Sequence, residues 1–353
     1  MFSFQKPHMA NINEVLIRDV FTQMVKHKAS LSRMILSDDE EELPDYRILA
    51  DLIIKNYPWP IGVELRRLFS GSMRQLDRMR LDQIFKTIER ATQFLSFVML
   101  SQLVNLKEQG KLIIPESFKN EFKNRFLVLS LGSYSWMIRS IGNLFREQKI
   151  EWFISEMPDY FDNKFYEILD FWVPERNEIG HYQINLTQEE IEKRCVEYEE
   201  KLSFILQRIS FLVKYKLVSV KEIKVIKSKL RDAAFHHVFD LLNSSDSDFK
   251  ANEIDESKFT ESHSVLLMKS IKSIDEYLNL SPLIIDTSTE VLDSKEKFEI
   301  KKDIFMYTKF RNDQLMYLGT EVTEKVDLRS LKYYETLLSE FKYLLSVVSP
   351  ETK

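Results

Sequence analysis

Apolar residues recur at spacings of three and four from about residue 12 to residue 215. This period is typical of helices that bury one face against a core. The pattern predicts helices over 12–36, 45–56, 76–109, 117–127, 130–148, 160–172 and 187–216. The breaks between them coincide with an acidic run at 37–45, with the Asn-Tyr-Pro-Trp-Pro segment at 56–60 and with Pro174.

The pattern changes after about residue 216. Short apolar runs bounded by Asn, Asp and Ser predict a mainly β region over 217–321, and the helical spacing returns over 327–348. We therefore expect an α+β protein, a mainly α-helical bundle followed by a smaller β-rich domain and a C-terminal helix. The expected domains are an N-terminal helical segment at 1–56, the bundle at 57–216 and the β-rich domain with its closing helix at 217–353.

Composition narrows the class of protein. The chain has 353 residues, 44% of them hydrophobic and 30% charged, which is enough apolar surface for a folded protein. Its seven glycines include no pair at the spacing of a Walker A loop or a dinucleotide-binding fingerprint, so nucleotide enzymes of those types are excluded. A net charge of −5 provides no general attraction to nucleic acid or to anionic membranes, so any contact with nucleic acid must be local.

The expected compartment is the cytoplasm. One cysteine, Cys195, cannot form an internal disulfide, and its charged neighbours predict a position on a solvated helix face. The N-terminus lacks the pattern of a signal peptide, and no segment is apolar over the roughly eighteen residues that a membrane span needs. We expect no membrane association.

The hexapeptide Arg-Asn-Glu-Ile-Gly-His, from Arg176 to His181, is the most informative motif. It follows the aromatic helix that Pro174 interrupts and precedes the long helix predicted from residue 187. If the hexapeptide is helical, five residues place Arg176 and His181 about 140° apart around the helix axis. A site that needs both side chains would then recruit a second copy of the segment.

The Arg-x4-His pattern, with Asn after Arg and Gly before His, resembles the signature of HEPN-domain ribonucleases. Other segments are similar to bacterial proteins that carry this domain between two further parts, and the resemblance extends over about 57–320. They are Tyr57-Pro58-Trp59-Pro60-Ile61, Leu65-Arg66-Arg67-Leu68, Leu131-Gly132 with Trp136, and Leu278-Asn279-Leu280-Ser281-Pro282-Leu283. The resemblance implies a helical bundle that forms a homodimer, in which both Arg-His sets line one cleft that cuts RNA without a metal or cofactor.

The residue types suit that chemistry. Histidine side chains in general titrate near neutrality, so His181 is suited to move the protons as a ribose 2′-hydroxyl attacks its own phosphate, which leaves a 2′,3′-cyclic phosphate end. Arg176 has planar donors that match phosphate oxygens, and Asn177 is expected to bind the phosphate or orient His181. The resemblance further implies a toxin-like endoribonuclease that cuts tRNA or mRNA in phage defence or growth arrest.

Basic residues cluster ahead of the motif. Arg66, Arg67, Arg74 and Arg78 are the candidate RNA-binding residues, with Arg80, Lys86 and Arg90 following. They form either a phosphate track or an ordinary charged helix face. Glu89 in the same stretch is a candidate partner of the motif.

Two other hypotheses remain open. According to the first of them, Arg176 and His181 pair with carboxylates such as Glu175 or Glu178, and the protein is a catalytically silent dimeric scaffold. Its C-terminal domain then presents a surface to a protein or nucleic acid, whereas in the nuclease that domain would sense a trigger or bind a regulatory protein.

A metal-dependent nuclease is the third possibility. Asp286 followed by Glu299-Ile300-Lys301 is similar to the acidic pattern of restriction-type enzymes. Three histidines, His236, His237 and His263, are also potential metal ligands. Adjacent histidines on a strand point to opposite faces, so strand positions explain them better.

Overall fold

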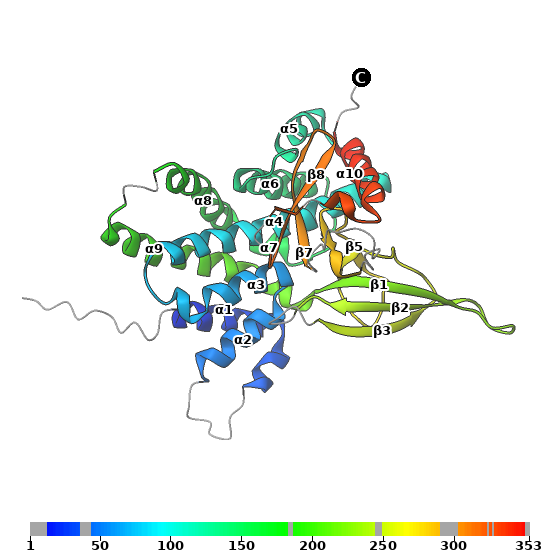
Figure 1. The fold of residues 1–353 in the computed structure, drawn as a ribbon, viewed down its shortest axis with the longest axis horizontal. Helices are drawn as coiled ribbons and strands as arrows, with labels where there is room; N and C mark the ends of the chain where they lie inside the picture. The colour runs from blue at the N-terminus through cyan, green and yellow to red at the C-terminus, as the bar shows by residue number, and fades with distance from the viewer. Residues whose placement is uncertain are drawn as a thin grey trace, which may run out of the picture. The chain divides into compact units, whose positions relative to one another are not determined.

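A computed structural model describes residues 13–35, 44–182, 186–243, 249–289, 303–322, 325–326 and 328–349. Within these ranges, helices form most of the N-terminal part, two antiparallel sheets follow, and a further helix lies near the C-terminus (Figure 1). The predicted α+β fold class is confirmed.

Contacts group the chain into two compact units. The first comprises Met1–Ala91, Asp159–Lys214 and Asn243–Ser245, and the second comprises Thr92–Pro158, Tyr215–Leu242 and Asp246–Lys353. The long helix α4 (Arg78–Glu108) begins in the first unit and continues into the second. The domain boundaries expected near residues 57 and 217 stay predictions, because compact units of contacts need not coincide with domains.

The described part of the first unit is helical. It contains α1 (Glu14–His27), the 3-10 helix η2 (Ala29–Met34), α2 (Tyr46–Asn56), α3 (Trp59–Leu68), η3 (Gly71–Met73), the first part of α4, α8 (Asn163–Tyr182), α9 (Gln188–Arg208) and η4 (Ser210–Lys214), while α7 (Met157–Tyr160) crosses the unit boundary. Each longer helix buries a stripe at helical spacing, as α1 does with Leu16, Val20 and Met24. Thr187 and Glu190 form a capping box that begins α9, close to the predicted start.

The break predicted at 56–60 is confirmed, since α2 ends at Asn56, but the helix that follows it is not among the predicted helices. The break predicted at Pro174 is wrong. Helix α3 begins within the Asn-Tyr-Pro-Trp-Pro segment, because a proline in the first turn needs no hydrogen bond from its nitrogen. Helix α8 does not end near residue 172 but continues through Pro174 to Tyr182. The ring of Trp172 packs edge-to-face against Phe85 and Tyr198, and this burial offsets the backbone hydrogen bond that Pro174 removes.

The second unit combines helices with both sheets. Its further helices are α5 (Glu116–Phe126), α6 (Leu131–Glu147) and α10 (Tyr334–Val348), with η5 (Thr287–Thr289) and η6 (Leu328–Ser330) as short turns. Ser130 caps α6 by accepting a hydrogen bond from the Ser133 backbone N–H, which confirms the predicted helix start. The closing helix begins at Tyr334, later than predicted.

Two antiparallel sheets are present among the described residues. One has the order β3-β2-β1-β4-β5 and the other β6-β7-β8-β9. The strands are β1 (Lys216–Ile226), β2 (Ala234–Leu241), β3 (Lys250–Glu256), β4 (Val265–Met268), β5 (Tyr277–Asn279), β6 (Ile284–Asp286), β7 (Ile304–Arg311), β8 (Gln314–Gly319) and β9 (Lys325–Val326). The mainly β region predicted for 217–321 is confirmed.

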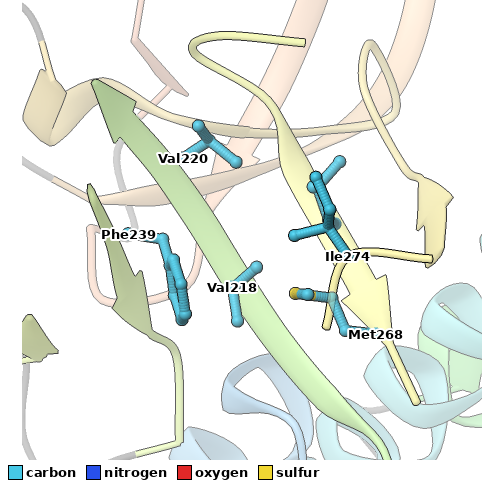
Figure 2. Packing of buried hydrophobic residues seen from close by; sticks show 6 residues of the cluster. Val218, Val220, Phe239, Met268 and Ile274 are labelled. Carbon is cyan, nitrogen blue, oxygen red and sulfur yellow. The ribbon is translucent and has the colours of Figure 1, made fainter. Parts of the chain in front are cut away.

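One face of the five-stranded sheet carries a hydrophobic core (Figure 2). Val218, Val220, Phe239, Met268 and Ile274 are buried there with Leu266. The pairing of β1 with β2 shifts register between Val220 and Glu222, as a β-bulge does. The extra residue reverses the alternation of side chains, so that Ile223 still packs against this core.

The helices of residues 92–158 join the four-stranded sheet through backbone and ring contacts. The Leu129 N–H donates to the Thr308 carbonyl at 2.9 Å, and Val128 forms a bridge with Lys309 of β7. The Phe126 ring stacks on Phe341 of α10 with a centroid distance of 5.6 Å. These contacts explain why the helices group with strands that are distant in sequence.

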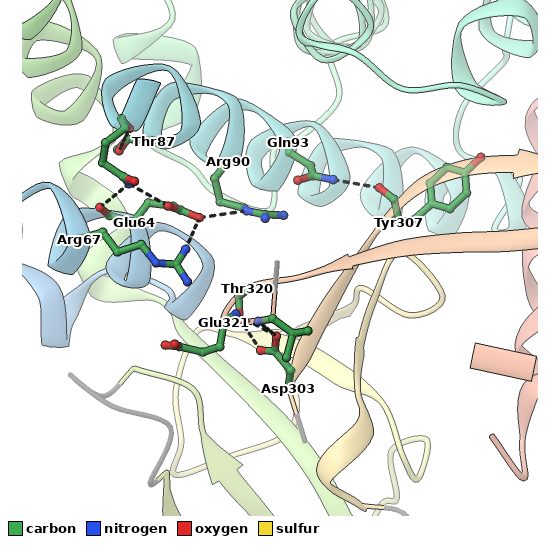
Figure 3. A network of polar contacts seen from close by, with 11 residues as sticks. Glu64, Arg67, Thr87, Arg90, Gln93, Asp303, Tyr307, Thr320 and Glu321 are labelled. Carbon is green, nitrogen blue, oxygen red and sulfur yellow. Dashed lines mark hydrogen bonds and ion pairs between the residues drawn. The ribbon is translucent and has the colours of Figure 1, made fainter. Parts of the chain in front are cut away.

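Asp303 organises the turn that follows β8 (Figure 3). Its carboxylate accepts hydrogen bonds from the Thr320 hydroxyl at 2.7 Å and from the backbone N–H groups of Glu321 and Val322 at 2.8 and 2.9 Å. A methyl group at Gly319 would lie 2.3 Å from the Asp303 Oδ2 atom. We expect Gly319→Ala to lower the free energy of unfolding by about 1–3 kcal/mol, because the displaced carboxylate loses these donors.

Urea denaturation followed by circular dichroism checks this prediction. Gly71→Ala is the matched control, because a Cβ atom there would meet no atom within 4 Å. Its effect should stay within about 0.5 kcal/mol. Equal stability of both variants would contradict the proposed clash at Gly319.

Candidate active site

The Arg-x4-His motif lies in the last turns of α8. The segment is helical up to Tyr182, so the backbone positions of Arg176 and His181 are about 140° apart around the helix axis, as the spacing predicts. The motif does not open the next helix, because α9 begins only at Gln188. The motif precedes the long helix, as predicted, but it belongs to the helix before it, because α8 continues through Pro174.

Arg176 lies on an exposed part of α8. Its side chain is 46% exposed, and its Nε atom is 4.0 Å from the Glu89 Oε2 atom of α4. An exposed pair at this distance contributes about 0–1 kcal/mol, so it holds the guanidinium weakly. The expected proximity of Glu89 to the motif is confirmed for Arg176.

The two carboxylates that flank Arg176 in sequence contact α9. Arg194 donates to the Glu178 Oε1 atom at 2.6 Å, and its other terminal nitrogen is 3.8 Å from Glu175. The Tyr198 hydroxyl also donates to Glu175. Burial of Tyr198, and then its hydrogen bond to Glu175, raises the pKa of this phenol above its usual range. Among the described ion pairs, Arg176 is paired with Glu89 and not with Glu175 or Glu178.

The other two motif residues have backbones within α8. The side chains of Asn177 and His181 lie outside the described part of the structure. Their catalytic roles, like that of Arg176, stay predictions.

Several of the basic side chains make structural ion pairs. Arg67 donates to the buried carboxylate of Glu64 at 3.0 Å, and the Arg90 Nε atom is 3.8 Å from the same oxygen (Figure 3). Arg78 pairs with Asp82 at 3.0 Å. Arg80 is fully buried and donates to Glu199 and to Asn13. Arg80 therefore belongs to the core of the first unit and not to a surface track.

Arg66 and Arg74 lie together at a cavity of the first unit. The cavity has a volume of about 360 Å³, and Arg47 of α2 also lines it. The guanidinium of Arg66 lies 5.5 Å from the centre of the Trp59 ring, in a cation–π contact. Sequence reasoning missed Arg47, because nothing in a local pattern indicates that α2 brings it to two arginines that follow later in the chain.

The residues of the metal-dependent alternative do not form a described metal site. Asp286 is buried at the end of β6, where Lys221 donates to it and also lies 3.2 Å from Asp240. Glu299 and Lys301 lie outside the described residues. No group of His, Cys, Asp and Glu side chains suited to a metal occurs within the described ranges.

The histidines have local partners. His236 contacts Asp255 at 2.7 Å from one face of β2, whereas His237 is buried and accepts from the Thr260 N–H at 3.2 Å. The expected strand positions are confirmed for these two. His263 instead lies in a turn with a left-handed backbone (φ 58°), so the strand prediction is wrong there.

Cys195 is buried in α9 and not solvated as its neighbours in sequence predict. Burial raises the pKa of its thiol to about 12, so only about 10⁻⁴ of it is thiolate at pH 8. We expect the native protein to react with 5,5′-dithiobis(2-nitrobenzoate) at pH 8 at least about 100-fold more slowly than the same protein unfolded in guanidinium. Equal rates in both conditions would contradict this burial.

No helix in the described ranges is long and apolar enough to cross a membrane. The site thus consists of one exposed arginine at the end of α8, a glutamate of α4, and two carboxylates tied to α9. Comparison with protein-family models, with curated proteins and with solved structures finds no match to this chain.

Proposed function

We propose that this protein is a metal-independent endoribonuclease of the HEPN type, in which Arg176 and His181 act on RNA in a homodimer. The exposed guanidinium of Arg176 carries the proposal. A guanidinium that is half exposed and only weakly paired is available to a phosphate, whereas one tied to a buried carboxylate is not.

The neighbouring ion pairs support this role. Arg194 and Tyr198 engage Glu175 and Glu178, so these carboxylates are occupied by α9 and compete less for Arg176. Glu89 is close enough to orient the guanidinium until a phosphate replaces it.

In the proposed mechanism, His181 removes the proton from the ribose 2′-hydroxyl as that oxygen attacks the adjacent phosphorus atom. Arg176 stabilises the added negative charge on the phosphate oxygens. The bond to the 5′-oxygen breaks, this oxygen takes up the proton that His181 returns, and a 2′,3′-cyclic phosphate remains. Because the two residues are about 140° apart on one helix, each active site takes residues from both protomers.

Arg66 and Arg74, with Arg47, are the best candidates for contacts to the RNA backbone. All three line one cavity, and the one carboxylate among its described lining residues, Asp51, also pairs with Lys55 at 2.7 Å. Arg67 and Arg78 have carboxylate partners in the folded protein and are weaker candidates.

Cleavage of purified tRNA and total RNA in excess EDTA tests the proposal. We expect fragments that end in a 2′,3′-cyclic phosphate, and a dimer in light scattering under the same conditions. Cleavage that EDTA abolishes would contradict the metal-independent mechanism. Cleavage by a protein that stays monomeric would contradict the shared site, and absence of cleavage would favour a dimeric scaffold.

A further inference from the structure

A second cavity, with a volume of about 700 Å³, lies entirely within the second unit. Its walls come from the last residues of β1, the first residues of β2, the segment between β3 and β4, and the first turns of α10. The lining residues are Ile223, Val225, Phe235, Phe259, Thr260, Glu261, Ser262, His263, Ser264, Ser281, Tyr333, Thr336, Leu337 and Glu340. Its size falls within the range of small-molecule sites.

Part of the apolar wall of this cavity comes from Ile223 and Val225, which follow the bulge in β1. Val225, which pairs with Phe235 of β2, is 66% exposed. Phe259 is 67% exposed, and its ring lies 5.1 Å from that of Phe235. Exposed side chains of this size beside a cavity offer apolar surface to a ligand.

Thr260 provides a polar group without a partner. Its residue is only 4% exposed, and its hydroxyl makes no hydrogen bond within the described part of the chain. A buried hydroxyl without a partner costs about 1–3 kcal/mol, which a ligand atom in the cavity would recover. His263 also lines the cavity, and its ring stacks on that of Tyr333 with a centroid distance of 6.1 Å and an interplanar angle of 12°.

The charge of the lining is negative. Glu261 and Glu340 contribute carboxylates, and the lining residues named above include no lysine or arginine. Partial burial, and then the negative charge of Glu261, raises the pKa of Glu340 above its usual range. Tyr277 donates to Glu261 at 3.2 Å and orients it. A cation between the two carboxylates would relieve their repulsion.

We propose that this cavity binds a small organic cation, an amine with an aromatic body and a polar substituent. The ammonium group lies between Glu261 and Glu340, the aromatic body contacts Val225, Phe235 and Phe259, and the polar substituent pairs with the Thr260 hydroxyl. Tyr333, which also lines the cavity, adds an aromatic face that favours a cation. This site is independent of the proposed nuclease activity.

Isothermal titration calorimetry of the full chain with three matched probes tests the proposal. Tyramine has the amine, the ring and a hydroxyl; 3-(4-hydroxyphenyl)propanoate replaces the amine by a carboxylate; phenethylamine lacks the hydroxyl. We expect tyramine to bind at least about tenfold more tightly than either of the others, a difference of about 1.4 kcal/mol. Equal binding of tyramine and the propanoate, or no binding of tyramine at millimolar concentration, would overturn the proposal.

Variants assign the binding to this cavity. Glu340→Gln and Glu261→Gln should each weaken tyramine binding about tenfold. Thr260→Val should remove the preference for tyramine over phenethylamine. Glu335→Gln is the control, because Glu335 lies in the first turn of α10 but does not line the cavity. Tyramine binding that all four folded variants retain would place the ligand elsewhere and overturn the assignment.

Discussion

Replacing His181 by alanine is expected to reduce the rate of RNA cleavage by about 10²- to 10⁴-fold, the contribution of a positioned general acid or base. Arg176→Ala should cause a loss of similar size, because the phosphate then lacks its charged donor. Single-turnover cleavage of tRNA in EDTA measures both effects. Arg176→Lys should recover little of the loss, since an ammonium group cannot form two parallel hydrogen bonds to the phosphate.

Arg125→Ala is the matched control for Arg176. Its side chain is 42% exposed, close to the 46% of Arg176, and pairs with Glu121 on its own helix. Full activity of Arg125→Ala beside inactive Arg176→Ala would separate a catalytic arginine from a general loss of positive charge. Equal cleavage by wild type and His181→Ala would remove His181 from the mechanism.

Mixing the two inactive variants tests whether the site is shared. A heterodimer of Arg176→Ala with His181→Ala retains one site with both residues intact if each site takes Arg176 from one protomer and His181 from the other. We therefore expect partial recovery of cleavage after the variants are unfolded and refolded together. Recovery is not expected if both residues act from the same protomer.

Glu64→Ala is expected to lower the free energy of unfolding by about 3–5 kcal/mol. The Glu64 carboxylate is 3% exposed, accepts from Arg67 at 3.0 Å and from Gln83 at 2.9 Å, and lies 3.8 Å from Arg90. Removing it leaves Arg90, which is only 7% exposed, without this carboxylate. A buried charge that loses its partner is more costly than the pair itself was favourable.

Urea denaturation monitored by circular dichroism measures this effect. Glu167→Ala is the control. The side chains of Glu167 and Lys164, which form an ion pair, are 68% and 52% exposed, so loss of this pair should change the free energy of unfolding by less than about 0.5 kcal/mol. Glu64→Gln should lower the free energy of unfolding by an amount between those of Glu64→Ala and Glu167→Ala, since its amide oxygen still accepts hydrogen bonds but carries no charge. A change below about 1 kcal/mol for Glu64→Ala would contradict the structural role of this network.

These experiments also decide between the nuclease and the silent scaffold. Both hypotheses require a folded dimer, so Glu64→Ala should impair both. Only the nuclease hypothesis predicts that Arg176→Ala and His181→Ala abolish cleavage while the fold is retained. The carboxylates near the motif do not by themselves favour the scaffold, because among the described contacts Glu175 and Glu178 pair with α9 rather than with Arg176.

Local periodicity determined much of the secondary structure. Helices α2, α4, α5 and α6 begin and end within a residue or two of the predictions, because each buries a stripe with a helical period. The change to short apolar runs after residue 216 likewise marked the strands. The same pattern did not place Arg176 and His181 on a helix, because the helix predicted over 160–172 ends before them, whereas α8 continues to Tyr182.

Tertiary packing decided the rest. Trp172 packs against Phe85 and Tyr198, and this contact favours the continuation of α8 through Pro174. Glu199 and Asn13 accept hydrogen bonds from Arg80 and hold it in the core despite its charge. Cys195 is buried although its neighbours in sequence are charged. Such outcomes depend on which residues approach from distant segments, and the free energy of those contacts exceeds local preferences. The sequence by itself therefore determined the elements and the candidate motif, and only the tertiary structure decided which charged side chains are buried in pairs and which remain exposed.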